Sequence, residues 1–350
     1  MGRCRRRWLI FHYEVLRCDT FSPSPLAGEG WGEGLVQASF EHRPVMLQEV
    51  LQGLAVRTSG VYLDGTFGRG GHAAAILERL GENGKLFAMD QDPQAVAAGL
   101  ERFAGDTRFE MIQGNFATLA DVCAARGITG KLDGVLLDLG VSSPQLDDAS
   151  RGFSFMKPGP LDMRMNPQAG LSAAQWLAVA EEKEIAEVLW QYGEERFSRR
   201  IARSILATRL ENPVTDTLQL AELISSAVPK KDKFKHPATR SFQAIRIHIN
   251  RELEVLQQAL AASAKMLTLN GRLAVISFHS LEDRIVKRFM RDIARGPQLP
   301  KYLPIMPVET PPEFRVVGKA VMPGETELAR NPRARSSVLR VLERCAESVL

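Results

Sequence analysis

Four short apolar runs alternate with helix-like segments between residues 61 and 140, and this alternation restricts the fold more than any other feature of the sequence. The runs are VYLD (61–64), KLFAMD (85–90), FEMIQGN (109–115) and LDGVLLDLG (132–140). Helix-like segments lie between them at 72–80, 93–103 and 118–126. Because the runs are almost wholly apolar, we expect parallel strands that are covered on both faces. The alternation therefore predicts a doubly wound α/β fold, whose ligands bind beyond the carboxyl ends of the strands.

Polar or aromatic residues stand where each expected strand ends. Three strands lead to Asp64, Asp90 and Asp138, and the other leads to Asn115 and Phe116. Any one of these residues could be a solubilising group at a strand boundary. Because the carboxyl ends of parallel strands share one edge of the sheet, the whole set predicts a ligand site there.

A glycine-rich loop follows the first expected strand and precedes a helix. Gly68, Gly70 and Ala73 satisfy the loose dinucleotide pattern G-x-G-x-x-G/A, which several nucleotide cofactors share. Asp64 distinguishes among them, since a carboxylate next to a pyrophosphate costs about 1–4 kcal/mol of repulsion. S-adenosylmethionine has no phosphate and carries an ammonium and a sulfonium. The loop therefore favours S-adenosylmethionine as the cofactor.

The residues around this loop take separate roles in that interpretation. Asp64 favours the positive end of the cofactor, and Asp90 accepts hydrogen bonds from the ribose hydroxyls. His72 lies in the first turn of the expected helix and offers a backbone donor, or is simply a polar residue there. Phe116 stacks on adenine in this interpretation, although core packing is the common fate of a single Phe.

A short polar loop after the fourth expected strand is the candidate site for the methyl acceptor. It reads Ser142-Ser143-Pro144-Gln145, and proline restricts its shape. Enzymes that methylate the exocyclic amine of a nucleic-acid base must orient that amine with hydrogen-bond acceptors around its N–H groups. The carbonyl and side-chain oxygens of such a loop can be these acceptors. An ordinary Ser-Pro turn is the alternative. We take Asp138, Ser142, Ser143 and Pro144 as candidate catalytic residues.

Helix-like sequence then fills residues 145 to 250, and an apolar run returns at GRLAVISF (271–278). We expect a helical substrate-binding domain (145–250) inserted between two parts of a methyltransferase domain (40–144 and 251–350). Residues 1–39 include the Pro/Gly/Ser-rich stretch TFSPSPLAGEGWGEG and are expected to be a disordered extension. A basic RNA-binding arm at its start, or a start codon further downstream, are alternative interpretations.

Composition is compatible with a cytoplasmic protein that binds nucleic acid. The net charge is +4, and the four cysteines show neither C-x-x-C pairs nor metal-ligand spacing with histidine. We therefore expect no disulfide framework, no metal and no membrane segment. Residues 228–251 hold seven Lys or Arg against one Asp, with Phe234 and Phe242 between them. Contacts to phosphates and stacked bases explain this cluster of cations better than a solvated basic face does.

The candidate RNA-binding residues come from this cluster and from one histidine near the last expected strand. They are Lys230, Lys231, Lys233, Lys235, Arg240, Arg246 and His279. Ser280 and Asp283 match the capping-box pattern S-x-x-D and should start a helix after residue 280. Arg333, Arg335 and Arg340 either reach RNA or line a terminal hairpin.

Several long motifs resemble one family closely. They are DGTFGRGGH, LLDLGVSSPQLDDASRGFSFM, GPLDMRM, YGEERFSRRIAR, KDKFKHPATRSFQAIRIHIN, SFHSLEDRIVKRFM and NPRARSSVLR, and the resemblance covers about residues 42–344. The sequence resembles the RsmH (MraW) family of 16S rRNA (cytosine(1402)-N(4))-methyltransferases. The resemblance implies a class I, Rossmann-like, S-adenosylmethionine-dependent fold with an inserted α-helical domain. It also implies cofactor residues Gly70, Gly71, His72, Asp90, Phe116, Asp138 and Gln145.

The implied substrate is a single cytidine of 16S rRNA near the P site of the 30S ribosomal subunit. Three other functions stay open at this point: a dinucleotide oxidoreductase, an assembly factor that only binds RNA, and a DNA amino-methyltransferase. Asp64 argues against the first, and the acidic strand ends have no role in the second. The sequence leaves open whether the chain is a homodimer. The N-terminal extension departs from the family, which usually begins just before HRPVM.

Overall fold

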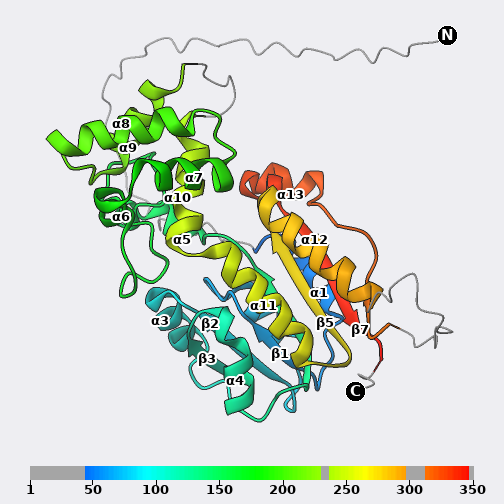
Figure 1. Cartoon of the computed structure of the whole chain (residues 1–350). Helices are drawn as coiled ribbons and strands as arrows, with labels where there is room; N and C mark the ends of the chain where they lie inside the picture. The colour runs from blue at the N-terminus through cyan, green and yellow to red at the C-terminus, as the bar shows by residue number, and fades with distance from the viewer. Residues whose placement is uncertain (1–43, 230–235, 297–311, 347–350) are drawn as a thin grey trace, which may run out of the picture. The chain divides into compact units, whose positions relative to one another are not determined.

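A seven-stranded mixed sheet with the order β3-β2-β1-β4-β5-β7-β6 organises the protein (Figure 1). The computed structural model describes residues 44–229, 236–296 and 312–346. The strands are β1 (Val61–Asp64), β2 (Lys85–Asp90), β3 (Phe109–Gln113), β4 (Leu132–Asp138), β5 (Leu267–Ser277), β6 (Phe314–Val316) and β7 (Val338–Arg344).

Five of these strands, β1 to β5, pair in parallel, as the apolar runs predict. In the pairing register, Asp64 lies opposite Ala88 of β2 and Leu136 of β4. The carboxyl ends of β1, β2, β4 and β5 therefore meet along one side of the sheet, which we call the carboxyl edge. Asp64, Asp90 and Asp138 all stand on it.

The sheet is covered on both faces. Successive residues of β4 pack into different cores, with Leu136 in one and Val135 and Leu137 in the other, and all three are buried. Helices α1 (Leu47–Leu54), α2 (Gly71–Leu77) and α3 (Pro93–Arg102) contribute to the first core. Helices α4 (Leu119–Ala125), α11 (Glu252–Met266) and α12 (Ser280–Arg295) contribute to the second. Burial on both faces explains why polar and apolar residues do not alternate along these strands.

A helical segment separates β4 from β5. It contains α5 (Ser143–Asp147), α6 (Ala173–Val179), α7 (Glu182–Gly193), α8 (Ser198–Glu211), α9 (Thr217–Ala227) and α10 (Ala238–Ile249). These helices have an apolar core of their own, which includes Leu177, Ile185, Leu189, Ile205 and Ile245. The fold is thus a doubly wound, Rossmann-like α/β sheet with helices inserted after its fourth strand. Within the described ranges, no helix is both long and apolar enough to cross a membrane.

The last strand runs against the others. β7 pairs antiparallel with both β5 and β6, so residues 338–344 belong to the main sheet. Arg340 on β7 forms an ion pair with Asp283 of α12, Nε to Oδ1 2.7 Å. Arg333, in the 3₁₀ helix η3 (Pro332–Ser336), forms one with Asp147 of α5 at 2.6 Å. The terminal-hairpin interpretation is therefore wrong: β6 and β7 pair antiparallel, but residues 317–337, which include α13 (Glu325–Arg330) and η3, separate them, and β7 also pairs with β5.

Candidate active site at the carboxyl edge

The glycine loop between β1 and α2 lies across the carboxyl edge. The Gly65 N–H donates to the Leu136 carbonyl of β4, and the Phe67 N–H donates to the Met89 carbonyl of β2, both at 2.9 Å. Gly68 and Gly70 then adopt φ values of 57° and 70°. These left-handed conformations suit glycine because it has no Cβ. The loop is therefore tied to two strands and turns sharply into the helix.

The start of α2 leaves little room for side chains on the loop. A Cβ on Gly70 would come within 2.5 Å of the Phe67 ring, and a Cβ on Gly71 within 2.7 Å of Pro44. Gly70 is the N-cap, so Gly71 and His72 are the first two residues of the helix. Their backbone N–H groups have no acceptor inside the helix. His72, which the sequence predicts to offer a backbone donor, therefore lies in the first turn of α2.

Buried polar atoms without a hydrogen-bond partner gather next to this loop. Asp64 is 1% exposed and His72 is 6% exposed, and the Asp138 side chain is 24% exposed. The described residues include eight buried side-chain N or O atoms without a partner, and four of them are here: Asp64 Oδ2, His72 Nδ1, His72 Nε2 and Asp138 Oδ1. Buried polar groups normally have a partner in the protein, a water or a ligand. This concentration identifies the carboxyl edge at β1 and β4 as a site for a polar, bound molecule.

The electrostatics of this cluster favour a positive charge. The pKa of Asp64 is raised to about 6, mainly because the carboxylate is buried; the Asp138 and Asp90 carboxylates also raise it, whereas His72 and the Thr66 N–H lower it. His72 Nε2 lies 3.5 Å from Asp138 Oδ2. A cation placed among these carboxylates would relieve the like-charge repulsion and the desolvation together.

Asp90 has a structural role that the sequence did not predict. Its Oδ2 accepts a hydrogen bond from the Gly68 N–H at 2.8 Å, and its Oδ1 accepts one from the Asp92 N–H at 2.9 Å. Burial raises the pKa of Asp90 to about 6, although these two backbone hydrogen bonds lower it. Asp90 therefore holds the glycine loop against β2. Each carboxylate oxygen retains a further lone pair for a ribose hydroxyl.

A buried ion pair that sequence reasoning missed fixes the loop after β4. Asp92 is 4% exposed, and its Oδ2 accepts hydrogen bonds from Arg151 Nη1 at 2.6 Å and from Gln145 Nε2 at 2.8 Å. Arg151 also donates to the Met165 carbonyl at 2.8 Å. Asp92 is also the N-cap of α3, but no local sequence signal connects it to a residue 59 positions away.

The same ion pair holds the Ser142–Gln145 loop, the predicted site of the methyl acceptor, through Gln145. Ser142 is the N-cap of α5, and its N–H donates to Gln145 Oε1 at 2.9 Å. Gln145 is 7% exposed, with its amide held between Ser142 and Asp92. Ser142 Cβ lies 3.9 Å from the position that a Cβ on Gly68 would occupy, so the two loops adjoin. The structure thus brings the Ser142–Gln145 loop next to the glycine loop.

Phe116 lies on the neighbouring stretch of the same edge. It begins the 3₁₀ helix η1 (Phe116–Thr118) after β3, is partly buried and packs against the second core. Its Cβ would be 3.3 Å from a Cβ on Gly65. Phe116 is therefore close to the start of the glycine loop, as an adenine-stacking residue must be.

The predicted RNA-binding residues are in different environments. Lys230, Lys231, Lys233 and Lys235 lie outside the described residues, and Arg240 is exposed on α10. Arg246 is largely buried and forms a bidentate ion pair with Glu252, with both N···O distances 2.8 Å. Its pKa is raised by Glu252 and Glu282, which outweigh the opposing effect of burial.

His279 caps α12, and the capping box differs from the predicted one. The His279 side chain accepts from the Glu282 N–H, while Glu282 Oε2 accepts from the Phe278 N–H at 2.8 Å. The prediction of Ser280 and Asp283 as the box is wrong by one residue, because Arg340 of β7 binds Asp283 instead. The His279 side chain is 11% exposed, with Nε2 3.1 Å from Glu282 Oε1.

One ring nitrogen of His279 and one carboxylate oxygen each of Glu282 and Glu252 lie within 4.8 Å of one another, as the ligands of a metal ion would. Arg246 already neutralises Glu252, and His279 with the backbone satisfies Glu282 and lowers its pKa despite burial. These ion pairs and hydrogen bonds therefore join the end of α10 and the start of α11 to the start of α12.

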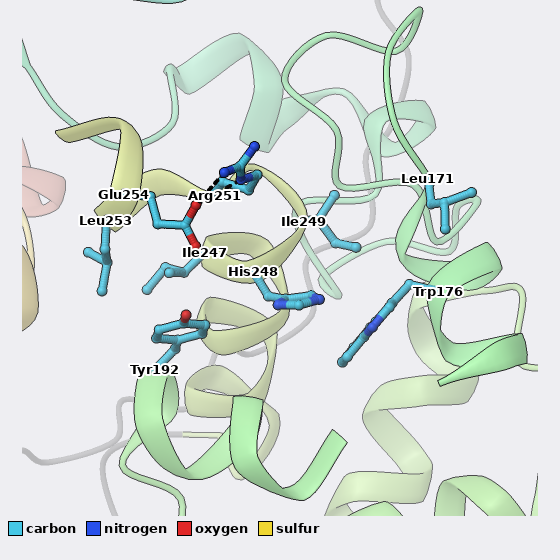
Figure 2. Close-up of a pocket in the computed structure, with 9 residues that line it drawn as sticks. All are labelled: Leu171, Trp176, Tyr192, Ile247, His248, Ile249, Arg251, Leu253 and Glu254. Carbon is cyan, nitrogen blue, oxygen red and sulfur yellow. Dashed lines mark hydrogen bonds and ion pairs between the residues drawn. The ribbon is translucent and has the colours of Figure 1, made fainter. Parts of the chain in front are cut away.

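A hollow of about 320 Å³ lies in the helical segment, close to α10 (Figure 2). The Trp176 and His248 rings are 4.5 Å apart, and Tyr192 stands on the other side of His248. Trp176 Nε1 donates to Glu184 at 2.7 Å, and burial lowers the pKa of His248. Sequence reasoning missed this hollow because its aromatic residues come from three separate helices.

A family model identifies the chain. The model of the MraW methylase family matches residues 39–345, which include both loops and the whole described sheet. The chain belongs to the MraW methylase family. A protein of this family is an S-adenosylmethionine-dependent methyltransferase acting on rRNA. The buried carboxylates fit that cofactor, since it brings a positive charge to atoms that otherwise have no partner.

Several solved structures are also similar to the chain. An rRNA methylase from Streptococcus thermophilus is 12% identical with a TM-score of 0.39, covering 86% of this chain and 96% of that one. A SAM-dependent O-methyltransferase from Thermotoga maritima is 8% identical with a TM-score of 0.38, covering 87% and 66%. A Streptococcus mutans protein described as a methyltransferase, in complex with SAH, is 12% identical with a TM-score of 0.37, covering 85% and 97%.

Proposed function

We propose that this protein methylates N4 of a single cytidine of 16S rRNA, position 1402 by family resemblance, in the 30S ribosomal subunit in the cytoplasm. This modification would tune the decoding region at the P site. The observation that carries the proposal is the group of unpartnered buried atoms on Asp64, His72 and Asp138 next to the Ser142–Gln145 loop. One side of this site suits a cation, and the other presents oxygens to an amine.

S-adenosylmethionine supplies the activated methyl group when it is bound. Asp64 Oδ2 and Asp138 Oδ1 would accept from its ammonium, and the first-turn N–H groups of Gly71 and His72 would donate to its carboxylate. Asp90 keeps lone pairs for the ribose, and Phe116 offers a ring to the adenine. Gln145 contributes by fixing the loop through its amide.

The acceptor amine has to be oriented before it can attack. The backbone and hydroxyl oxygens of Ser142 and Ser143, on a loop restricted by Pro144, would accept from its N–H groups. Asp138 ends β4 four residues before Ser142, and its Oδ2 lies 3.5 Å from His72 Nε2, so an Asp138 carboxylate oxygen would accept a second N–H. The buried Asp92–Arg151 pair keeps the loop in place, and such preorganisation is what orienting catalysis requires.

Residues 145–250 are proposed to bind the RNA around the target base. Arg240 is exposed there, and the hollow beside Trp176, Tyr192 and His248 is wide enough for an unpaired base on an aromatic ring. Lys230, Lys231, Lys233 and Lys235 would add phosphate contacts. Arg246 would act indirectly, since its guanidinium holds Glu252.

Mass spectrometry of 16S rRNA fragments tests the function directly. A strain without the gene should lack one methyl group on one cytidine, and the wild-type gene should restore it. Asp138→Asn should fail to restore it, whereas Asp121→Asn, an exposed change on α4, should succeed. An unchanged 16S methylation pattern in the deletion strain would refute the proposal. Loss of a methyl from chromosomal DNA instead would make the protein a DNA methyltransferase.

A further inference from the structure

Helix α12 carries a row of exposed cations that the functions assigned so far do not use. All five lie on solvent-exposed positions of one helix: Arg284, Lys287, Arg288, Arg291 and Arg295. Their spacing of three, four, seven and eleven residues from the first places them on a single helical face. We call these five residues the α12 stripe. At 1.5 Å per residue, it extends for about 16 Å.

The opposite face of α12 is already used. Val286 and Met290 are 0% and 1% exposed and pack in the second core with Ile285, Phe289 and Ile293. A helix that inserts into a membrane surface needs a free apolar face next to its cations. Since α12 has buried that face against the sheet, the stripe is a purely electrostatic surface.

The stripe is much more positive than the chain as a whole. The chain has 45 Lys and Arg against 41 Asp and Glu, whereas the exposed face of α12 has five cations and one anion, Asp292. Arg291 pairs with Asp292 at 2.7 Å, and Arg284 pairs with Glu194 at 3.7 Å. No carboxylate in the described ranges pairs with Lys287, Arg288 or Arg295.

A solvated helix face usually looks different. On α7, for example, Lys183 and Glu187 form an i,i+4 pair of opposite charges. Like charges at such spacings repel each other by a few tenths of a kcal/mol per pair. Only two of the five cations on α12 have an ion-pair partner among the described residues, so the repulsion along the stripe is only partly compensated. A polyanion bound along the stripe would relieve the rest.

The N-terminal end of α12 lies near the loop that follows β4. α12 begins at Ser280, two residues after Phe278, whose ring lies 3.7 Å from the position of a Cβ on Gly140, just after β4. The capping box of His279 and Glu282 and the Asp283–Arg340 ion pair hold this end of the helix. Arg284 also contacts Glu194, the C-cap of α7 in the helical segment. The row of cations thus leads away from the carboxyl edge.

We propose that the α12 stripe binds backbone phosphates of the RNA substrate, on a segment that flanks the target nucleotide. The proposal rests on the proposed function, because it assigns the RNA a second contact surface outside residues 145–250. Charge complementarity identifies the partner, since RNA presents regularly spaced phosphates to Lys and Arg. The contacts position the RNA and read no base.

Salt-dependent binding to unmethylated small ribosomal subunits, isolated from a strain without the gene, tests this surface. The variant carries Lys287→Gln, Arg288→Gln and Arg295→Gln, which remove three cations without breaking an ion pair in the described ranges. The slope of log affinity against log salt should decrease by about 2–3, and affinity near 0.15 M salt should fall at least tenfold. KM for the subunits should rise, while kcat and the affinity for S-adenosylmethionine stay the same.

A matched variant controls for the loss of three charges. Arg79→Gln, Lys85→Gln and Lys131→Gln change exposed cations elsewhere on the sheet domain and should leave the salt slope unchanged. A stripe variant with Lys287→Arg, Arg288→Lys and Arg295→Lys should keep the salt slope of the wild type, since that slope depends on the number of cations that neutralise phosphates. Unchanged cofactor affinity in every variant shows that each is folded.

The outcomes separate the stripe from the proposed function. If the wild type methylates the subunits and the stripe variant has the same slope and KM, the stripe proposal is overturned and the function stands. If the wild type neither binds nor methylates them, both are overturned. Stripe-dependent binding to phosphatidylglycerol vesicles, with RNA binding unaffected, would replace the RNA by a membrane surface and also overturn the proposal.

Discussion

Asparagine in place of Asp64 should make the protein more stable without its cofactor and less able to bind it. The carboxylate is 1% exposed and has an unpartnered Oδ2. Burial raises its pKa from 3.8 to about 6, so the folded state holds this proton more tightly than the unfolded chain. The stability cost is absent below the unfolded pKa, grows as pH rises from about 4, and is complete above the folded pKa.

The magnitude follows from the size of that shift. Two pKa units correspond to about 3 kcal/mol at pH 8, and about half of that remains at pH 5. Asp64→Asn removes the cost and should raise the melting temperature by about 5 °C at pH 8, with a smaller rise at pH 5. Loss of the carboxylate partner should weaken S-adenosylmethionine binding by about 2 kcal/mol, roughly 30-fold.

Scanning fluorimetry at both pH values and titration calorimetry measure the two effects. Asp90→Asn is the informative control, because both Asp90 oxygens accept backbone N–H groups from Gly68 and Asp92. An amide can replace only one of those acceptors, so this variant should gain little stability or lose some. If Asp64→Asn leaves the melting temperature at pH 8 and the cofactor affinity unchanged, a strained, cation-binding carboxylate is the wrong description of Asp64.

Three further substitutions test how the site is held together. Asp92→Asn leaves buried Arg151 without its carboxylate, so we expect about 3–5 kcal/mol less stability in urea unfolding and a loss of methylation. Arg246→Gln breaks a largely buried ion pair and should cost about 2–4 kcal/mol in the same assay, whereas exposed Arg240→Gln should reduce RNA affinity and leave stability unchanged. Gly70→Ala, at φ 70° and 2.5 Å from a phenylalanine ring, should cost at least about 1–2 kcal/mol and weaken cofactor binding in calorimetry.

Matched changes at more exposed positions control these results. Asp106→Asn affects a partly exposed ion pair with Arg108 and should cost less than Asp92→Asn, whose ion pair is buried. Gly105→Ala has a similar φ of 84° but nothing within 4 Å of the added Cβ, so its cost isolates the backbone strain. Equal effects in both members of either pair would contradict the importance of burial and packing in the site.

The central strands were predictable because burial on both faces of the sheet produces a continuous apolar run in the sequence. β1, β2 and β4 are buried on both faces, so their residues are nearly all apolar and their polar ends stand out. β7 is different, since its sequence VLRVLER mixes apolar residues with Arg340, Glu343 and Arg344, and it lies second from the edge of the sheet. Its sequence therefore suited a hairpin or an RNA contact equally well, and its antiparallel pairing with β5 decided the matter.

Charged residues were the least predictable part of the site. Arg246 belongs to a basic cluster in the sequence, yet the turn before α11 brings Glu252 to its guanidinium and takes it away from solvent. The sequence predicts a capping box from Ser280 and Asp283 at the start of α12, but His279 and Glu282 form it and Asp283 binds Arg340 of β7. Local patterns identify which residues carry charge, but the partner of each charge depends on contacts distant in the sequence.

The sequence by itself determined the sheet and its carboxyl edge, because hydrophobic periodicity and glycine conformation act over a few residues. It also placed Asp64, Asp90 and Asp138 on that edge, since parallel strands end together. Only the tertiary structure decided which of these carboxylates are satisfied: Asp90 by two backbone groups, Asp64 and Asp138 each with an oxygen that has no partner. The energy of a charge depends on burial and on neighbours from other strands, and these exist only once the chain has folded.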